Sequence, residues 1–150
     1  MTLAHLIGFL HVATLAIGFG GLLIRTRALK KLSSTDGLTD VFYGDNLYGI
    51  AALLWIGTGF WRAFGGLEKG TDYYLDSAAF LIKMGLFTLI FLLEIYPMVT
   101  FIKWRIATKR QQPVDITVAS TLYRLCMAQL AVLLAIVYMA TAMARGMWYG

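Results

Sequence analysis

Four long apolar stretches alternate with short polar segments along the chain, and almost no sequence is left over for a soluble domain. The stretches are residues 3–24, 46–64, 77–102 and 116–143. A helix needs about 20 mostly apolar residues to cross the hydrocarbon core of a bilayer, and each stretch meets that length. Because backbone polar groups in lipid must be satisfied within the segment, these stretches are expected to be helices and not open strands.

The short connections between the stretches predict an up-down topology, since consecutive membrane spans alternate in direction. We therefore expect an all-α membrane protein, a bundle of four transmembrane helices forming a single domain over residues 1–150. The composition agrees, because 59% of the residues are hydrophobic, whereas soluble domains are usually about 45–50% apolar.

Basic residues are distributed unevenly between the two ends of the predicted bundle. Eight follow the first and third stretches: Arg25, Arg27, Lys30, Lys31, Lys103, Arg105, Lys109 and Arg110. The opposite end has Arg62, Lys69 and Arg145. Because Lys and Arg are enriched in cytoplasmic loops, this pattern predicts cytoplasmic loops after the first and third helices and both termini outside. The net charge of +5 then reflects membrane anchoring, and no nucleic-acid partner is expected.

Ionisable residues within membrane spans are costly and are usually paired or functional. Those in or near the apolar stretches are His5, His11, Lys83, Glu94, Arg124 and, close to the end of the second stretch, Arg62. Glu94 lies nine residues before Lys103, and Arg124 lies nine residues after Asp115. The two are thus at similar depth, which predicts a buried structural ion pair between Glu94 and Arg124. A proton-relay or substrate role is the alternative for these two residues.

The two histidines of the chain, His5 and His11, both lie in the first stretch. Six residues along a helix correspond to a rotation of about 120° and a rise of roughly 9 Å. They therefore do not bind one small metal ion together, nor serve as the two axial ligands of one haem. His11 is the deeper residue and needs a hydrogen bond or a metal, while His5 is expected at the interface or at a second ligand site facing another subunit.

Haem b is the ligand that best suits the layer around His11. Haem takes an axial His, with Met as an accepted second ligand, and Met139 lies at matching depth. Arg62 and Lys83 lie in the same layer and can receive the two propionates. The alternative is a His11 that is hydrogen-bonded to a neighbouring helix, with Arg62 and Lys83 extending to the interface.

Two stretches, YGIAALLWIGTGFWRAFGGLEKG (48–70) and YYLDSAAFLIKMGLF (73–87), resemble an uncharacterised family of small four-helix bacterial membrane proteins. A more distant likeness is to HemJ-type protoporphyrinogen oxidases, small haem-b membrane proteins of the bacterial inner membrane. Their first helix has a His followed by Gly-Leu and then Arg, as His11 is followed here by Gly21, Leu22 and Arg25, and Lys83 resembles a Lys of their third helix. The resemblance implies haem ligation by His11. A further His of that family is replaced here by Glu94.

Three functions remain open at this point. The first is a haem-b redox or electron-transfer protein, an oxidoreductase acting on a membrane quinol or a porphyrinogen. The second is a transporter or channel for a small ion or metabolite, with a polar path lined by His11, Lys83, Glu94 and Arg124. The third is a structural or assembly subunit of a membrane complex. Glycines on the helix faces favour a homo-oligomer in the bilayer, because small residues let membrane helices approach closely.

Overall fold

The computed structural model describes residues 2–66, 72 and 75–147. Its helices are α1 (Leu3–Lys31), the short 3-10 helix η1 (Thr35–Gly37), α2 (Leu38–Phe64), α4 (Ala78–Lys109) and α5 (Ala119–Ala144). Each of the four long helices is long and apolar enough to cross a membrane, and the described residues contain no strand. The predicted fold class, an all-α bundle of four membrane helices, is confirmed.

Three helices extend beyond the apolar stretches at the end of the bundle where the basic residues gather. α1 ends at Lys31 and not near residue 24, α2 begins at Leu38 and not near residue 46, and α4 ends at Lys109 and not near residue 102. The extensions of α1 and α4 contain Lys and Arg, which are good helix formers, so these two helices continue past the apolar stretches. As a result, Arg25 lies within α1 and not in a loop.

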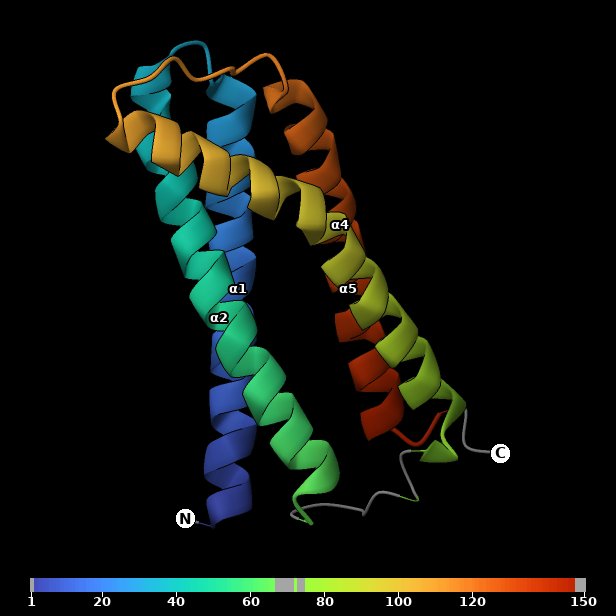
Figure 1. Cartoon of the computed structure of the whole chain (residues 1–150). Helices are drawn as coiled ribbons and strands as arrows, with labels where there is room; N and C mark the ends of the chain where they lie inside the picture. The colour runs from blue at the N-terminus through green and yellow to red at the C-terminus, as the bar shows by residue number, and fades with distance from the viewer. Residues whose placement is uncertain (1, 67–71, 73–74, 148–150) are drawn as a thin grey trace.

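The four helices form two packed pairs, α1 with α2 and α4 with α5, and the pairs are joined by α1 against α5. Figure 1 shows α1 and α2 side by side, with α4 crossing in front of them towards its C-terminal end. α4 also bends in its second half (Figure 1), where Pro97 lies inside the helix. Proline removes one helix hydrogen bond and displaces the preceding turn, which accounts for the bend.

The backbones of α1 and α2 are in direct contact at Gly21 and Gly44. A Cβ atom built on Gly44 would lie 2.4 Å from the backbone nitrogen of Arg25, and one built on Gly21 would lie 2.6 Å from the backbone nitrogen of Tyr48. Only glycine fits at both positions, because these distances are far below van der Waals contact. This close approach brings Arg25 and the neighbour of Gly44, Asp45, together inside the bundle.

The outer surface of the bundle is strongly apolar. Large hydrophobic side chains on several helices are exposed, among them Phe9 (64%), Leu53 (72%) and Phe91 (57%). Such a surface is costly in water and favourable in a bilayer, so it agrees with the membrane assignment.

Candidate functional site

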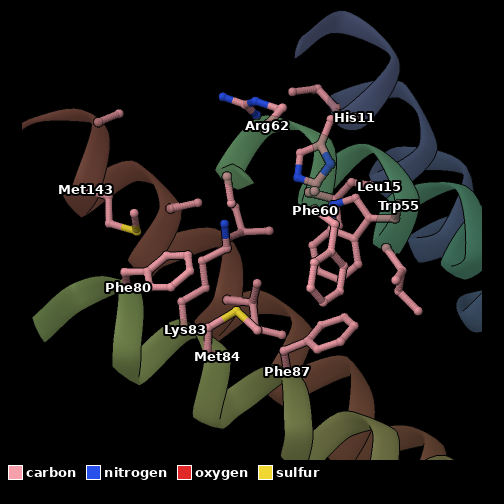
Figure 2. A pocket seen from close by; sticks show the side chains of 18 of the residues that line it. His11, Leu15, Trp55, Phe60, Arg62, Phe80, Lys83, Met84, Phe87 and Met143 are labelled. Atoms are coloured by element: carbon pink, nitrogen blue, oxygen red, sulfur yellow. The ribbon is translucent and has the colours of Figure 1, made fainter. Parts of the chain in front are cut away.

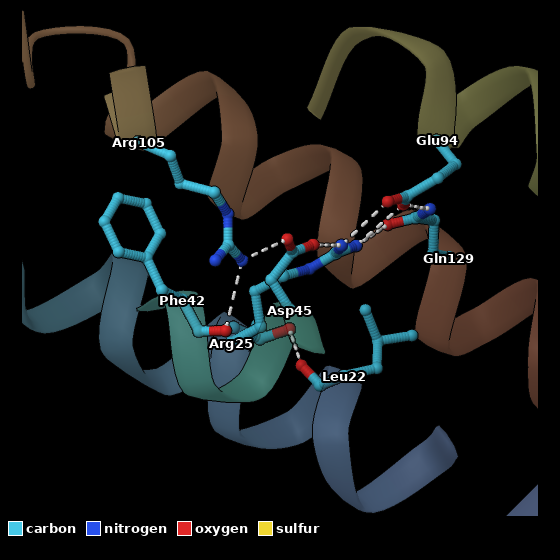
Figure 3. Close-up of polar contacts among 8 residues, drawn as sticks. Leu22, Arg25, Phe42, Asp45, Glu94, Arg105 and Gln129 are labelled. Atoms are coloured by element: carbon cyan, nitrogen blue, oxygen red, sulfur yellow. Dashed lines mark hydrogen bonds and ion pairs between the residues drawn. The ribbon is translucent and has the colours of Figure 1, made fainter. Parts of the chain in front are cut away.

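Arg25 is fully buried, with 0% of its surface exposed. Its Nη1 donates hydrogen bonds to Glu94 Oε1 at 2.9 Å and to Asp45 Oδ1 at 3.0 Å, and its Nη2 donates to Glu94 Oε2 and Gln129 Oε1, both at 2.8 Å (Figure 3). Arg25 comes from α1, Asp45 from α2, Glu94 from α4 and Gln129 from α5. One guanidinium therefore connects all four long helices.

A second arginine completes this group, which we call the Arg25 cluster: Arg25, Asp45, Glu94, Arg105 and Gln129. Arg105 Nη2 donates to Asp45 Oδ2 at 2.8 Å, and Gln129 Nε2 donates to Glu94 Oε2 at 2.6 Å. With two arginines and two carboxylates, the formal charge of the cluster is balanced. Buried charges are tolerated when they are paired and hydrogen-bonded. This pairing meets that condition at both terminal nitrogens of Arg25, whereas its Nε has no partner among the described residues.

Aromatic rings surround the buried guanidinium. The Cζ atom of Arg25 lies 4.7 Å from the centre of the Tyr48 ring and 5.3 Å from that of Phe101. A cation within about 6 Å of a ring centre is attracted to the ring face. The rings thus partly replace the water that the guanidinium loses on burial.

The structure corrects the predicted ion pair of Glu94 with Arg124. The Glu94 carboxylate is bonded by Arg25 and Gln129, whereas the Arg124 side chain is exposed. The prediction matched depth and left out helix rotation: Arg124 and Gln129 are five residues apart, which turns them about 140° from each other. Gln129 takes the inward face of α5, and Arg124 takes an outward one.

A cavity of about 270 Å³ lies near the other end of the bundle and is lined by residues of all four long helices (Figure 2). We call it the His11 cavity. Figure 2 shows His11, Arg62 and Lys83 around it, with aromatic and methionine side chains between them. The lining residues used below are His11, Leu15, Trp55, Ile56, Gly59, Phe60, Arg62, Phe64, Lys83, Met84, Phe87 and Met143.

The imidazole of His11 is held in one orientation. Its Nδ1 lies 2.9 Å from Thr58 Oγ1, and the Thr58 hydroxyl donates to the carbonyl of Leu54 at 2.8 Å. In the tautomer in which the Thr58 hydroxyl donates to that carbonyl, Nδ1 of His11 donates to Thr58, and Nε2 has the lone pair. The ring stacks on Trp55 with 5.6 Å between ring centres. This neutral tautomer is the form in which imidazole binds metal ions.

Gly59 allows this packing around the imidazole. A Cβ atom on Gly59 would lie 3.2 Å from Cε1 of His11, tighter than ordinary contact. This role of Gly59 could not be predicted from the sequence, because α2 contains several glycines and nothing in the sequence shows which of them faces His11.

The remaining predicted site residues divide into two groups. Arg62 and Lys83 line the His11 cavity, in agreement with the prediction that they lie in the same layer of the membrane as His11. His5 is exposed and is not among the lining residues. Met139 is buried in the core at 8% exposure and does not line the cavity, whereas Met84 and Met143 do line it.

A larger cavity of about 600 Å³ adjoins the first and reaches the Arg25 cluster. We call it the Glu94 cavity. The two cavities share Leu15, Trp55, Ile56 and Phe87 as wall residues. The lining residues of the Glu94 cavity used below are Gly18, Asp45, Tyr48, Gly49, Ile50, Ala52, Leu53, Trp55, Phe87, Phe91, Glu94, Met98 and Arg105.

The residues expected to line a transport path are not together. His11 and Lys83 line one cavity, Glu94 lines the other, and Arg124 lines neither. Across the described part of the chain, no three His, Cys, Asp or Glu side chains gather in a way that could hold a metal ion.

A family model described as "Predicted membrane protein (DUF2214)" covers residues 3–148. No curated protein and no solved structure matches the chain.

Proposed function

The chain belongs to the DUF2214 family, whose members are described as predicted membrane proteins, and we propose its function from the geometry of its own residues. The proposed function is that of a membrane protein that binds haem b through His11 and has a redox or electron-transfer role. The observation that carries the proposal is the hydrogen bond between Nδ1 of His11 and the Thr58 hydroxyl, 2.9 Å long. Histidines that bind metals commonly donate their other ring N–H to a fixed acceptor, which sets the tautomer and orients the ring. His11 is arranged in this way within a cavity lined by all four long helices.

Arg62 and Lys83 supply two cationic side chains to the same cavity, from α2 and α4. Haem b carries two propionates and is otherwise mostly apolar. The two cations match the propionates, and a mostly apolar wall that includes aromatic side chains matches the rest of the group. The imidazole is a ligand type that haem iron takes. Met84 or Met143, and not Met139, would supply a thioether to the bound group, because these two side chains line the cavity.

The size of the cavity also bears on the proposal. Its volume of about 270 Å³ is slightly below the roughly 300–1,000 Å³ typical of small-molecule sites. Two of its wall residues, Phe60 and Phe64, are 51% and 47% exposed, so the site is open towards the bilayer. That open side allows the site to take a group larger than the space it encloses.

Haem b, when bound, would supply one-electron redox chemistry. The chain's own residues would orient the ligand nitrogen, neutralise the acidic edge of the group and exclude water from it. The distant resemblance to HemJ-type oxidases supports the same reading, because His11, Gly21, Leu22, Arg25 and Lys83 match that pattern. A porphyrinogen or a quinol is the substrate class that this role implies.

An absorption spectrum of the purified protein tests the proposal. We expect a Soret band in the oxidised and dithionite-reduced protein and, by pyridine haemochrome assay, close to one haem per chain. Haem is added to a second sample to separate poor loading from absence of a site. A protein that stays colourless in both samples contradicts the proposal.

We also propose that the protein lies in a bacterial inner membrane as a homo-oligomer, with both termini outside. Arg25 and Arg105 belong to the Arg25 cluster and no longer count as loop charges, but Arg27, Lys30, Lys31, Lys103, Lys109 and Arg110 still follow the first and third apolar stretches. In whole cells, a membrane-impermeant maleimide should label a Thr2→Cys variant and leave a Ser33→Cys variant unlabelled. The opposite pattern contradicts the orientation.

Cross-linking of the protein in its membrane tests the homo-oligomer. Finding only monomers at every cross-linker concentration contradicts it.

A further inference from the structure

The Glu94 cavity is open to the hydrocarbon region of the bilayer. Ile50, Leu53, Phe91 and Met98 line it and are between 45% and 72% exposed. All four residues lie within helices that are long and apolar enough to cross a membrane. A molecule that enters this cavity therefore comes from the lipid phase and has an apolar body.

The wall of the Glu94 cavity is rich in aromatic side chains. Tyr48, Trp55, Phe87 and Phe91 line it, and the rings of Trp55 and Phe87 are tilted against each other with 5.6 Å between their centres. Aromatic side chains favour stacked or edge-on contact with another ring. The lining also includes Gly49, which is exposed, and a Cβ atom built there would meet nothing within 4 Å. This space suits a flat ring better than a flexible acyl chain.

The polar end of the cavity presents carboxylate oxygens. The side chains of Asp45 and Glu94 are each 20% exposed although both are paired with Arg25. Glu94 Oε1 and both oxygens of Asp45 each accept one hydrogen bond within the cluster, and an ionised carboxyl group has about four acceptor positions. Oxygens with acceptor positions left over favour a hydroxyl donor. Because the charge of the cluster is balanced, they also favour an uncharged ligand over a phosphate headgroup.

Trp55 supplies an independent observation. It is 9% exposed, and its indole N–H has no acceptor among the residues that the structure describes. A buried donor without an acceptor is costly, and an oxygen of a ligand would offset that cost. Trp55 lines the Glu94 cavity and also forms its shared wall with the His11 cavity.

From these features we propose that the Glu94 cavity binds a quinol from the bilayer. Its hydroxyl groups donate to the carboxylates at the polar end, its ring lies among Tyr48, Trp55, Phe87 and Phe91, and its isoprenoid tail leaves between Leu53 and Met98 towards lipid. The role of the site rests on the redox function proposed above, in which the quinol exchanges electrons with the group held by His11. Only the shared wall that includes Trp55 and Phe87 would lie between the two. The binding itself depends only on the Glu94 cavity.

Photolabelling with an azido-hydroquinone that carries one prenyl unit tests this proposal. In the full-length protein in lipid nanodiscs, we expect label on residues 45–56 and 87–98, and protection by excess unlabelled prenyl-hydroquinone. Gly49→Leu should reduce the protected label at least tenfold by filling the cavity, and Ala52→Leu is a second blocking variant if Gly49→Leu does not fold. Gly57→Leu is the matched control, since Gly57 is on the same helix, has nothing within 4 Å of a built Cβ and lines neither cavity.

Three outcomes overturn the quinol site. They are label spread evenly over the lipid-facing surface, label that both blocking variants leave unchanged, and equal protection by a long-chain fatty alcohol, which would indicate an acyl chain in the cavity. The assay is run with haem-loaded and haem-free protein. Protected label in a protein that takes up no haem supports the quinol site and counts against the haem proposal, whereas haem uptake without protected label overturns the quinol site alone.

Discussion

The guanidinium of Arg25 and the carboxylate of Glu94 form a two-pronged ion pair inside the bundle, with N–O distances of 2.9 and 2.8 Å. Arg25 belongs to α1 and Glu94 to α4, which are members of different packed helix pairs. Parallel N–H···O bonds of this kind are among the stronger polar contacts in proteins. The pair therefore holds the two halves of the bundle in register at the depth where the Glu94 cavity ends.

Replacement of Arg25 by Gln should destabilise the protein by about 3 kcal/mol, because removing one partner of a buried pair leaves an uncompensated charge. The free energy of unfolding is measured by denaturant titration in detergent micelles. Arg27→Gln is the control, since Arg27 is exposed on the same helix. Equal stability of the two variants would show that the Arg25 cluster does not hold the helices together.

Joint replacement of Arg25 and Glu94 by Met should cost less than the single Arg25→Gln change. The double variant removes both charges, and apolar replacements of buried pairs are often close to neutral. Asp45 and Arg105 still pair with each other in this variant. The same titration measures the double variant. If it is less stable than Arg25→Gln, the attraction between the two charges exceeds the cost of burying them, and the pair stabilises the bundle.

Gly21→Ala should destabilise the bundle by about 1–3 kcal/mol, as overpacking does in well-packed interiors. The added methyl group would lie 2.6 Å from the backbone nitrogen of Tyr48 and force α1 and α2 apart. The neighbouring Gly20 has nothing within 4 Å of a built Cβ, so Gly20→Ala should be neutral or slightly stabilising. Thermal unfolding of both variants measures the difference, and similar midpoints would contradict the close helix contact.

Thr58→Val should weaken haem binding about 10- to 100-fold, the usual effect of losing the group that orients a metal-binding histidine. Valine keeps the shape of threonine but cannot accept the hydrogen bond from Nδ1 of His11. Thr58→Ser keeps the hydroxyl and should bind haem nearly as well as the wild type. Haem titration followed at the Soret band compares the three proteins. An unchanged affinity in Thr58→Val would remove the orienting role of Thr58.

The sequence predicted the number and type of helices because long apolar stretches in a chain of this composition leave little choice. It also brought Arg62, Lys83 and His11 into one layer, because depth in a membrane follows from residue count along a helix. The placement of Arg25 was missed, since an arginine just after an apolar stretch is usually a loop charge. Its spacing of four residues from Gly21, which places the two on one helix face, was the signal that could have identified it.

The pairing of Glu94 was also beyond the sequence. Depth alone pointed to Arg124 as the partner of Glu94. The residue of α5 that does bond Glu94 is Gln129, and which of the two faces α4 depends on how α5 is rotated. That rotation is set by packing of the core, where Leu122, Cys126 and Leu133 are buried along the same face as Gln129. Such a face becomes visible only when the helix neighbours are known.

The most direct test of the central claim, that His11 holds a haem, is a comparison of His11→Ala with His5→Ala. His5 is the matched control because it is the other histidine of the chain, lies on the same helix and is exposed. Haem per chain is counted by pyridine haemochrome assay after purification in the presence of added haem. The account predicts close to one haem per chain in the wild type and in His5→Ala, and almost none in His11→Ala. A His11→Ala protein that retains a full complement of haem would contradict it.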